Sequence, residues 1–325
     1  MTSAAPGGAV LVVAEELEAA ADMVVDRLNR RNVPVLRFDA AAFPQQLALA
    51  AGYSGSGWTG TLVTAGRPVR LEEVRAVYWR RPGRPQVAGG IPGPYRLWAR
   101  DQADAALLNV LSALPVRWLN NPHIDRPAAH KPQQLHIATA CGLAVPRTLV
   151  TNDPDAARKW AADLGTPIVC KPVLGGRLED RGERRRMVPT HPVDTRCLDA
   201  SVGLTGHMFQ ERVPKAYEVR LTAVGGRLFA AIIHAGSEQA GQDWRTDYPA
   251  LTYGTTTAPD HVAAGVLAFL DAYKLAYGAF DFAVTPAGEW VFFECNPCGT
   301  WAWVEQRTGL PIAAAHADYL SGATT

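Results

Sequence analysis

The feature that most restricts the fold of this 325-residue chain is a pair of strand–turn–strand patterns in its last third. Each pattern places two apolar runs around a short turn: Tyr217–Val224 and Arg227–His234 flank Gly225-Gly226, and Tyr277–Thr285 and Glu289–Cys295 flank Pro286-Ala287-Gly288. Turns this short join neighbouring antiparallel strands. A helical pattern at about His261–Lys274 separates the two hairpins. We therefore expect an antiparallel sheet with helical cover at this end of the chain.

The first third of the chain carries a different pattern. An apolar strand at Ala9–Ala14 is followed by a helical periodicity from Leu17 to Leu28 and by a second strand at Val33–Phe38. Strand, helix and strand with short connections are typical of α/β domains. Two further strands are expected within Gly57–Leu71 and one at Val74–Arg80. The predicted fold class is therefore α/β (α+β).

The middle of the chain alternates helices and strands. Its predicted elements are a helix at Lys131–Cys141, a strand at Val145–Thr151, a second helix, and a strand at Pro167–Val173. The second helix is expected to be capped by Asp153, to have Pro154 at its first position and to end before Gly165. The polar run Arg177–Arg186 holds five arginines in ten residues and is expected to be a solvated loop. These patterns divide the chain into an N-terminal domain (1–118), a central subdomain (119–207) and a C-terminal subdomain (208–325).

Composition excludes several classes of protein. The chain has 32 basic and 31 acidic side chains, so no net charge draws it to nucleic acid or to an anionic membrane. No apolar run approaches the roughly 18–20 residues of a membrane span, and the N-terminus does not resemble a signal peptide. Five scattered cysteines form no disulfide framework, and the single C-x-x-C at Cys295–Cys298 lacks the second pair of a zinc site. We expect a cytoplasmic protein.

The strongest cluster of polar residues is Asp281, Glu294 and Asn296. Side chains alternate along a strand, so Glu294 and Asn296 share one face. If the second hairpin is centred between Ala287 and Gly288, Asp281 lies opposite Glu294 on that face. Two carboxylates and an amide oxygen are hard ligands that suit Mg²⁺ held between protein and nucleotide phosphates. The alternative is that the carboxylates are ordinary exposed residues of a half-solvated sheet.

Three other residues carry suggestive chemistry. Glu218 and Arg220 share a face of the earlier hairpin and could bind ribose hydroxyls and a phosphate, although alone this pattern favours a surface ion pair worth at most ~1 kcal/mol. Lys171 ends a strand just before Gly175-Gly176, where backbone N–H groups can approach phosphate oxygens. The chain has only five lysines against 27 arginines, so each retained ammonium is a candidate phosphate contact.

Taken in order, these features resemble the ATP-grasp superfamily. The ordered set is Lys131, Lys171 with its Gly-Gly loop, Phe209-Gln210-Glu211-Arg212-Val213, Glu218 with Arg220, Asp281, and Glu294-x-Asn296. Further segments resemble the graspetide synthetases, which are microviridin-type peptide maturases. Those segments are Val77-Tyr78-Trp79-Arg80-Arg81-Pro82, Gly142–Thr148, Asp243-Trp244-Arg245, and Asn296-Pro297-Cys298-Gly299-Thr300-Trp301-Ala302-Trp303. The resemblance implies an ATP-grasp fold with an N-terminal pre-ATP-grasp domain, a central lid and a C-terminal antiparallel sheet.

The resemblance also implies a role for each motif residue. For the nucleotide, Lys131 and Lys171 would contact the ATP phosphates, Gln210, Glu211 and Val213 would frame adenine, and Glu218 would bind ribose. Mg²⁺ would be held by Asp281, Glu294 and Asn296. Arg220 and Arg245 would act at the transferring phosphoryl group and the acyl phosphate. Two departures stand out. The glycine loop is rich in arginine, and Cys298 replaces an expected polar residue and has no assigned role.

The implied activity is an ATP-dependent macrocyclase. It would phosphorylate an Asp or Glu side chain of a ribosomal precursor peptide, and a Ser, Thr or Lys side chain would displace phosphate to form an ester or amide. Arg177, Arg184, Arg185 and Arg186 would attract the acidic core or hold the leader. The alternatives are a ligase that adds an amino acid or amine to a small molecule or protein, and an ATP-binding module without catalysis. A homodimer is also expected, from the apolar C-terminal segment and Trp-rich surface.

Overall fold

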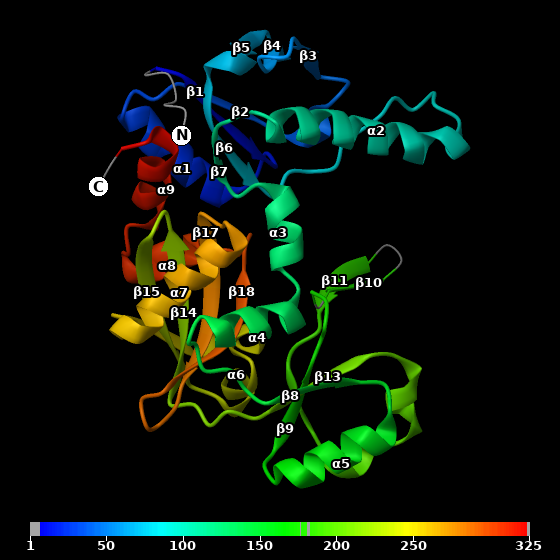
Figure 1. Ribbon diagram of the computed structural model, residues 1–325, viewed down its shortest axis with the longest axis vertical. Helices are drawn as coiled ribbons and strands as arrows, with labels where there is room; N and C mark the ends of the chain where they lie inside the picture. Colours follow the sequence, from blue (N-terminus) through cyan, green and yellow to red (C-terminus); the bar gives the residue numbers. More distant parts are fainter. Residues whose placement is uncertain (1–6, 176, 181–182, 324–325) are drawn as a thin grey trace.

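The computed structural model describes residues 7–175, 177–180 and 183–323. Figure 1 shows three parts stacked along the long axis: the N-terminal domain at the top, a five-stranded antiparallel sheet with its helices in the middle, and a smaller lobe at the bottom right. No helix in the described part of the chain has the length and apolar character needed to cross a bilayer.

Two sheets build the N-terminal domain. A parallel sheet has the order β2-β1-β6-β7, from Val35–Phe38, Ala9–Ala14, Val74–Arg80 and Arg117–Leu119. An antiparallel sheet has the order β3-β4-β5, from Leu47–Tyr53, Trp58–Thr64 and Arg67–Arg70. The helices are α1 (Ala19–Arg30) and α2 (Gly93–Ser112). The expected pair of strands is therefore present, but its partner β3 was missed, because an alanine-rich segment gives little strand signal.

The smaller lobe is a four-stranded antiparallel sheet covered by one helix. Its order is β12-β9-β13-β8, from His191–Val193, Ile168–Lys171, His207–Glu211 and Thr148–Thr151. Helix α5 (Pro154–Leu164) begins as predicted: the side chain of Asp153 accepts from the backbone N–H groups of Asp155 and Ala156. It ends at Gly165, whose φ of 66° favours glycine. Helices α3 (Pro122–Ala128) and α4 (Lys131–Ala140) connect this lobe to the N-terminal domain.

The Arg-rich segment is a hairpin, not the solvated loop that its composition indicated. Strands β10 (Arg177–Asp180) and β11 (Glu183–Met187) pair antiparallel, with Arg177 opposite Met187. Ladder hydrogen bonds satisfy the backbone of a charged segment as well as that of an apolar one, and charge content therefore did not reveal the pairing. Figure 1 shows the hairpin standing between α3 and the smaller lobe. The side chains of its arginines lie outside the described part of the structure.

The central sheet has the order β16-β15-β14-β17-β18 and contains both predicted hairpins. Its strands are β14 (Tyr217–Val224), β15 (Arg227–Ala235), β16 (Leu251–Thr256), β17 (Tyr277–Val284) and β18 (Trp290–Asn296). One face packs on α7 (Asp260–Tyr273) through an aromatic and aliphatic core that includes Val219, Phe269, Phe280 and Phe292. The opposite face is left for the polar side chains that alternate with these residues.

The C-terminal helices do not stay with the central sheet alone. Helices α8 (Ala302–Thr308) and α9 (Ile312–Ser321) return to the N-terminal domain, where α9 lies beside α1 in Figure 1. Val304, Ile312 and Leu320 belong to the same buried cluster as Val10 and Val24. The apolar C-terminal segment is therefore internal packing between the two ends of the chain, and it is not the free surface that a dimer would need.

Candidate functional site

The register of the second hairpin brings the predicted acidic residues together. Asp281 pairs with Glu294, as expected, and Arg220 on β14 pairs with Asp281. The Nδ2 of Asn296 lies 3.2 Å from Oε1 of Glu294 and 3.5 Å from Oδ2 of Asp281. The two carboxylates are mostly buried and are not exposed residues of a half-solvated sheet. Buried carboxylates need cationic or hydrogen-bonding partners.

Two lysines supply positive charge beside Glu294. The Nζ of Lys131 lies 3.3 Å from Oε2 of Glu294 and donates to the carbonyl of Pro172 at 2.9 Å. The Nζ of Lys171 lies 4.5 Å from the ring centre of Phe293. Burial lowers the pKa of Lys171 to about 8, against the opposing charge of Glu294. Burial alone would raise the pKa of Glu294, but Lys131 and Lys171 hold it below its usual range.

Arg220 lies behind Asp281. Its buried Nε is 2.8 Å from Oδ1 of Asp281, and its guanidinium carbon lies 5.5 Å from the ring centre of Trp244 and 5.9 Å from that of Trp303. Burial raises the pKa of Asp281, and the charge of Arg220 opposes that rise. Arg220 and Glu218 each have another partner, so they do not form the surface ion pair that the sequence alone favoured.

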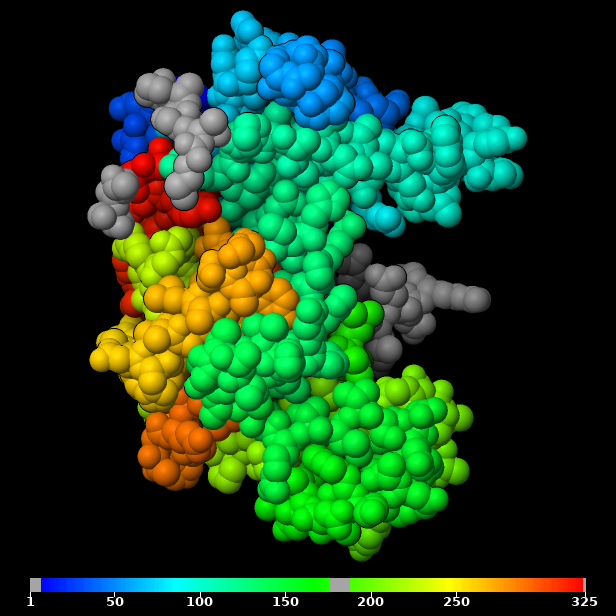
Figure 2. Space-filling view, in the orientation of Figure 1, coloured from blue at the N-terminus to red at the C-terminus, as the bar shows by residue number. Residues whose placement is uncertain are grey.

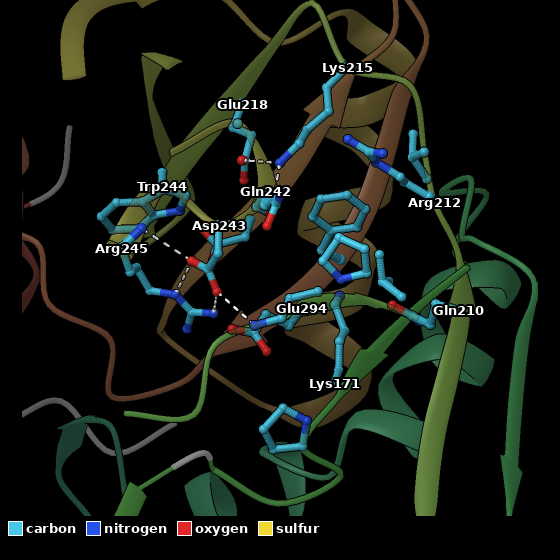
Figure 3. Close-up of a pocket in the computed structure, with 18 of the residues that line it drawn as sticks. Lys171, Gln210, Arg212, Lys215, Glu218, Gln242, Asp243, Trp244, Arg245 and Glu294 are labelled. Atoms are coloured by element: carbon cyan, nitrogen blue, oxygen red, sulfur yellow. Dashed lines mark hydrogen bonds and ion pairs between the residues drawn. The ribbon is translucent and has the colours of Figure 1, made fainter. Parts of the chain in front are cut away.

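Arg245 is held by a neighbouring carboxylate. Its Nε and Nη2 donate to the two oxygens of Asp243 at 2.8 and 2.6 Å. The same carboxylate is buried and accepts from the backbone N–H of Thr190 at 3.0 Å. Figure 3 shows Asp243 between Arg245 and the pocket floor near Glu294. Asp243 therefore fixes the direction of Arg245 and joins it to the segment that follows the Arg-rich hairpin.

The segment between the lobes provides the other wall. The side chain of Gln210 is buried and donates to Oγ1 of Thr148 at 2.9 Å, while Glu211 forms an ion pair with Arg147 at 2.7 Å. Lys215 donates to the carboxylate of Glu218 in a short ion pair. Lys215 also lies 3.5 Å from the carbonyl of Gln242. The sequence interpretation gave Lys215 no role, although it is one of only five lysines.

One pocket collects most of the predicted residues. It is lined by Lys131, Lys171, Gln210, Glu211, Val213, Glu218, Arg245, Asp281 and Glu294, together with residues given no role from the sequence: Val169, Pro172, Val188, Thr190, Pro192, Arg212, Lys215, Gly241, Gln242, Asp243, Trp244 and Phe293. Arg220 and Asn296 contact the lining from behind. Phe293 was missed because strict alternation puts it opposite Glu294, whereas a bulge after Asp281 lets both side chains face the pocket.

The donor set fits a magnesium ion shared with phosphate groups. No group of three or more His, Cys, Asp or Glu side chains in the described residues is placed to bind a metal. The predicted set instead offers two carboxylates and one amide, and Mg²⁺ bound with nucleotides takes only one or two protein carboxylates and fills its remaining positions with phosphate and water. Asp281, Glu294 and Asn296 therefore suit Mg²⁺ only together with a phosphate ligand.

Tyr78-Trp79-Arg80-Arg81 lies at the contact between β6 and the turn that follows β18. Arg80 is buried and donates to the carbonyls of Cys298 and Gly299, and Arg81 donates to the carbonyl of Cys298. All five cysteines are free, and the buried Cys295 belongs to the apolar core beneath the sheet. The C-x-x-C pattern therefore marks a structural turn.

Comparison with known proteins agrees with this geometry. The family model of the MvdD pre-ATP-grasp domain matches residues 10–126. An ATP-grasp ligase associated with RiPPs (ribosomal peptides modified after translation) from Chryseobacterium gregarium, solved with ADP and a leader and core peptide, is similar with a TM-score of 0.89 and 26% identity over 98% of each chain. Macrocyclase MdnC from Microcystis aeruginosa, bound to precursor peptide MdnA, is similar with a TM-score of 0.83 and 27% identity over 97% of this chain and 100% of MdnC. No curated protein matches the sequence.

The fold and the pocket define an ATP-grasp ligase. Macrocyclase MdnB from Microcystis aeruginosa is similar as well, with a TM-score of 0.76 and 27% identity over 96% of this chain and 98% of MdnB. The N-terminal part of the chain matches the MvdD pre-ATP-grasp domain, and the chain as a whole is similar in fold to RiPP-associated ATP-grasp ligases and macrocyclases. The resemblance inferred from the sequence motifs is thereby confirmed.

Proposed function

We propose that this enzyme is an ADP-forming macrocyclase for a ribosomal precursor peptide. It would activate an Asp or Glu side chain with ATP and join it to a Ser, Thr or Lys side chain of the same peptide. The observation that carries the proposal is the convergence of Lys131, Lys171 and Arg245 on two buried carboxylates in one pocket. The similarity to a ligase solved with ADP and its leader and core peptide supports the substrate class.

The nucleotide would lie along the pocket wall formed by β13 and β14. Lys131 and Lys171 carry the positive charge that phosphate groups need. The backbone of Gln210 to Val213 would frame adenine, and Glu218 would accept ribose hydroxyls. Because Lys215 now pairs with Glu218, ribose would bind at an already oriented carboxylate. Gln210 is fixed by Thr148, which keeps this wall rigid.

Asp281, Glu294 and Asn296 would hold Mg²⁺ at the opposite end of the nucleotide. When bound, the ion would neutralise phosphate charge and orient the γ-phosphate for in-line transfer. Arg220 would then share Asp281 with the ion. We assign Arg220 and Arg245 to the reacting groups, with Arg245 at the pocket surface and Arg220 behind it.

The chemistry has two balanced steps. A carboxylate oxygen of the peptide attacks the γ-phosphorus, the bond to the bridging oxygen breaks, and ADP leaves. The hydroxyl or amine of the second side chain then attacks the acyl carbon, loses its proton, and expels phosphate. Arg245 faces the pocket as a fixed cation and would stabilise the developing oxyanion. Positioning and electrostatics supply most of the rate enhancement in such reactions.

Intact-mass spectrometry tests the proposal directly. The chain would be incubated with Mg·ATP and the Asp/Glu- and Ser/Thr-rich peptide encoded beside its gene. We expect the loss of one water per bond formed, with a matching amount of ADP. A mass gain equal to an amino acid or amine would favour the ligase alternative. Bound nucleotide with neither a mass change nor ADP release would favour a non-catalytic module.

The Arg-rich hairpin is proposed as a contact for the peptide. Arg177, Arg184, Arg185 and Arg186 lie on β10 and β11, close in sequence to the pocket residues Val188 and Thr190. Replacing Arg184, Arg185 and Arg186 with Glu should raise the peptide KM and leave the affinity for ADP unchanged. Steady-state kinetics with a peptide titration, beside calorimetry with ADP, separates the two effects. An unchanged peptide KM would contradict this role.

We further propose that the enzyme is a homodimer that pairs through α2. Figure 2 shows the first turns of this helix as the cyan protrusion at the upper right, beyond the body of the molecule. Tyr95 and Trp98 are each 64% exposed there, and small exposed residues follow further along the same stripe at Ala105 and Ala106. A bulky half and a small half on one helix face are self-complementary when two copies pair antiparallel.

The helix register makes this pairing specific. An antiparallel arrangement centred on Gln102 sets Trp98 opposite Ala106 of the second copy. Replacing Trp98 with Glu should convert the dimer to a monomer in sedimentation-velocity analysis. Leu204, which is 84% exposed elsewhere, is the matched control when replaced with Glu. A monomeric wild type, or a dimer that persists in the Trp98 variant, would contradict this interface.

The cytoplasm is the location that we propose for this activity. All five cysteines are free in the structure, and free thiols are typical of a reducing compartment. The cytoplasm also supplies ATP and newly made precursor peptide.

A further inference from the structure

The turn after β18 is held by side chains from other parts of the chain. Each of its three carbonyls accepts at least one hydrogen bond from a side chain. The carbonyl of Pro297 accepts from Nδ2 of Asn120 at 3.0 Å, and that of Gly299 accepts from Nη1 of Arg80 at 2.8 Å and from the hydroxyl of Tyr277 at 2.9 Å. The carbonyl of Cys298 accepts from Nη1 of Arg80 at 3.0 Å and from Nε and Nη2 of Arg81 at 3.1 and 2.9 Å. Side chains seldom occupy every carbonyl of a surface turn, because water can bond to them as well. This turn is therefore specifically held.

Arg80 is the main residue of this clamp, and it comes from the N-terminal domain. It ends β6, is 2% exposed, and its Nε lies 3.2 Å from Oε1 of Glu18 at the start of α1. A buried guanidinium is expensive to desolvate and is tolerated only where its donors are used. Here Nη1 serves two carbonyls of the turn and Nε faces Glu18, while Nη2 has no hydrogen-bond partner among the described residues.

The clamped turn begins directly after Asn296. The carbonyl of Asn296 accepts from the N–H of Gly299 at 3.0 Å, so the residue belongs to both the strand and the turn. A Cβ at position 299 would lie 2.5 Å from that of Ala279, so the turn cannot shift toward β17. Between these constraints, the amide of Asn296 points at Glu294 and Asp281.

We infer that Arg80, assisted by Arg81, is a positioning residue of the magnesium site. It holds the carbonyls of Cys298 and Gly299 and thereby fixes the direction of Asn296 toward the bound ion. This inference rests on the proposed function, because it takes Asn296 as a ligand of Mg²⁺. It gives the N-terminal domain a part in nucleotide chemistry that does not involve the peptide.

Calorimetry with ADP, in the presence and absence of Mg²⁺, tests the inference without a peptide substrate. The quantity of interest is the ratio of the two dissociation constants. Arg80→Met should reduce this Mg²⁺-dependent tightening by about 10-fold or more, as is typical when a ligand loses its support. The Kd for ADP without Mg²⁺ should stay within about twofold of the wild-type value, which corresponds to a small change in binding free energy. Arg80→Lys should restore only part of the loss, because one ammonium lacks the guanidinium geometry.

Two further variants keep the test decisive. Arg81 is exposed and its replacement with Met removes two donors to Cys298 without opening the core, so this variant decides the question if Arg80→Met does not fold. Arg31→Met is the matched control, because Arg31 joins α1 to Asp318 of α9 at 2.6 Å, an interdomain ion pair on a different element from the turn. We expect Mg²⁺ to tighten ADP binding less in Arg81→Met than in wild type, and as much in Arg31→Met as in wild type.

The outcomes separate this inference from the proposed function. If wild type shows Mg²⁺-dependent tightening and neither Arg80→Met nor Arg81→Met reduces it, the positioning role is wrong and the nucleotide site stands. An equal reduction in Arg31→Met would show a general effect of loosening the domain contact and would also overturn the inference. If Mg²⁺ does not tighten ADP binding in wild type, the proposed metal site and this inference fail together.

Discussion

Lysine use is the residue-scale feature that best locates the site. Three of the five lysines, Lys131, Lys171 and Lys215, line the same pocket although the chain has 27 arginines to choose from. An ammonium group is compact and acts as a point charge, whereas a guanidinium prefers flat, bidentate partners. Scarcity made all five lysines candidates, and the resemblance to the ATP-grasp motifs then selected Lys131 and Lys171. The third, Lys215, needed the structure, because its partner Glu218 is only defined by the fold.

Replacing Glu294 with Gln tests the metal set at this scale. The change keeps the side-chain shape and its contact with Asn296 but removes the charge that Lys131 and Lys171 now balance. We expect kcat to fall by about 100-fold, in the range found when one electrostatic contact to a reacting group is lost. ADP release in a coupled assay measures the effect. Turnover within about twofold of wild type would contradict the metal assignment.

Asn120 is the residue that joins the N-terminal domain to the central sheet. Its amide donates to the carbonyls of Tyr277 and Pro297, and its oxygen accepts from the N–H groups of Ala276 and Tyr277. Asn120→Ala should lower the free energy of unfolding by about 2–4 kcal/mol, because buried backbone groups lose their partners. Urea unfolding measures the change. Asn121→Ala, which removes the cap of α3 and a 3.4 Å hydrogen bond from Ser112, should cost about 1 kcal/mol and is the control.

At the scale of elements, hairpins were predictable and their irregularities were not. The second hairpin was predicted, but its turn is centred on Ala287, and that register alone would set Asp281 opposite Phe293. The bulge after Asp281 shifts the register by one residue and gives the predicted pairing of Asp281 with Glu294. The bulge at Phe293 was not predictable, because an extra residue in a strand leaves no signal in the turn. The β10–β11 pairing was missed for a related reason: a charged segment lacks the apolar alternation that indicates a strand.

Helix α9 gives the protein a specific sensitivity to acid. His316 is fully enclosed, stacks on Trp301 with ring centres 4.6 Å apart, and shares a hydrogen bond between Nδ1 and the carbonyl of Ile312. Burial lowers the pKa of His316 to about 3. The folded state therefore keeps the ring neutral while the unfolded chain, with a pKa of about 6.5, binds a proton. Its contribution to stability is complete above pH 6.5 and is lost as the pH falls toward 3.

His316→Gln should remove this pH dependence. For wild type, His316 should contribute a loss of about 1.4 kcal/mol in the free energy of unfolding for each pH unit between about 6 and 4. The variant should be less stable at pH 7 and should show a shallower slope, since Gln does not titrate. Urea unfolding at several pH values gives both slopes. The exposed His136→Gln is the control, and equal slopes for wild type and His316→Gln would contradict the interpretation.

At the scale of the whole molecule, the two ends of the chain share one core. Leu320 on α9 is 0% exposed in the cluster that contains Val10 and Val24, whereas Leu17 is 95% exposed. Leu320→Ala should lower the free energy of unfolding by about 2–5 kcal/mol, as expected for a fully buried leucine. Leu17→Ala should change it by less than about 0.5 kcal/mol. Thermal or urea unfolding of both variants measures the difference, and similar values would contradict the shared core.

This long-range arrangement was beyond the sequence. The apolar pattern of residues 311–320 is typical of a helix, but periodicity says nothing about which distant surface a helix will cover. The same holds for Arg80, whose role depends on a turn more than 200 residues away. The motifs located the pocket because most of their residues lie on strands, or at the start of a helix, that local sequence patterns predict. The contacts that support it join separate parts of the chain.

The shared core also bears on how the protein is made. Domains generally fold as they leave the ribosome, the N-terminal one first. Here the face of β1 and β6 that α9 covers stays exposed until residues 312–321 have been synthesised. A chain whose translation stops early would keep this apolar face open to chaperones and proteases. The N-terminal domain therefore completes its apolar core only when α9 packs on it.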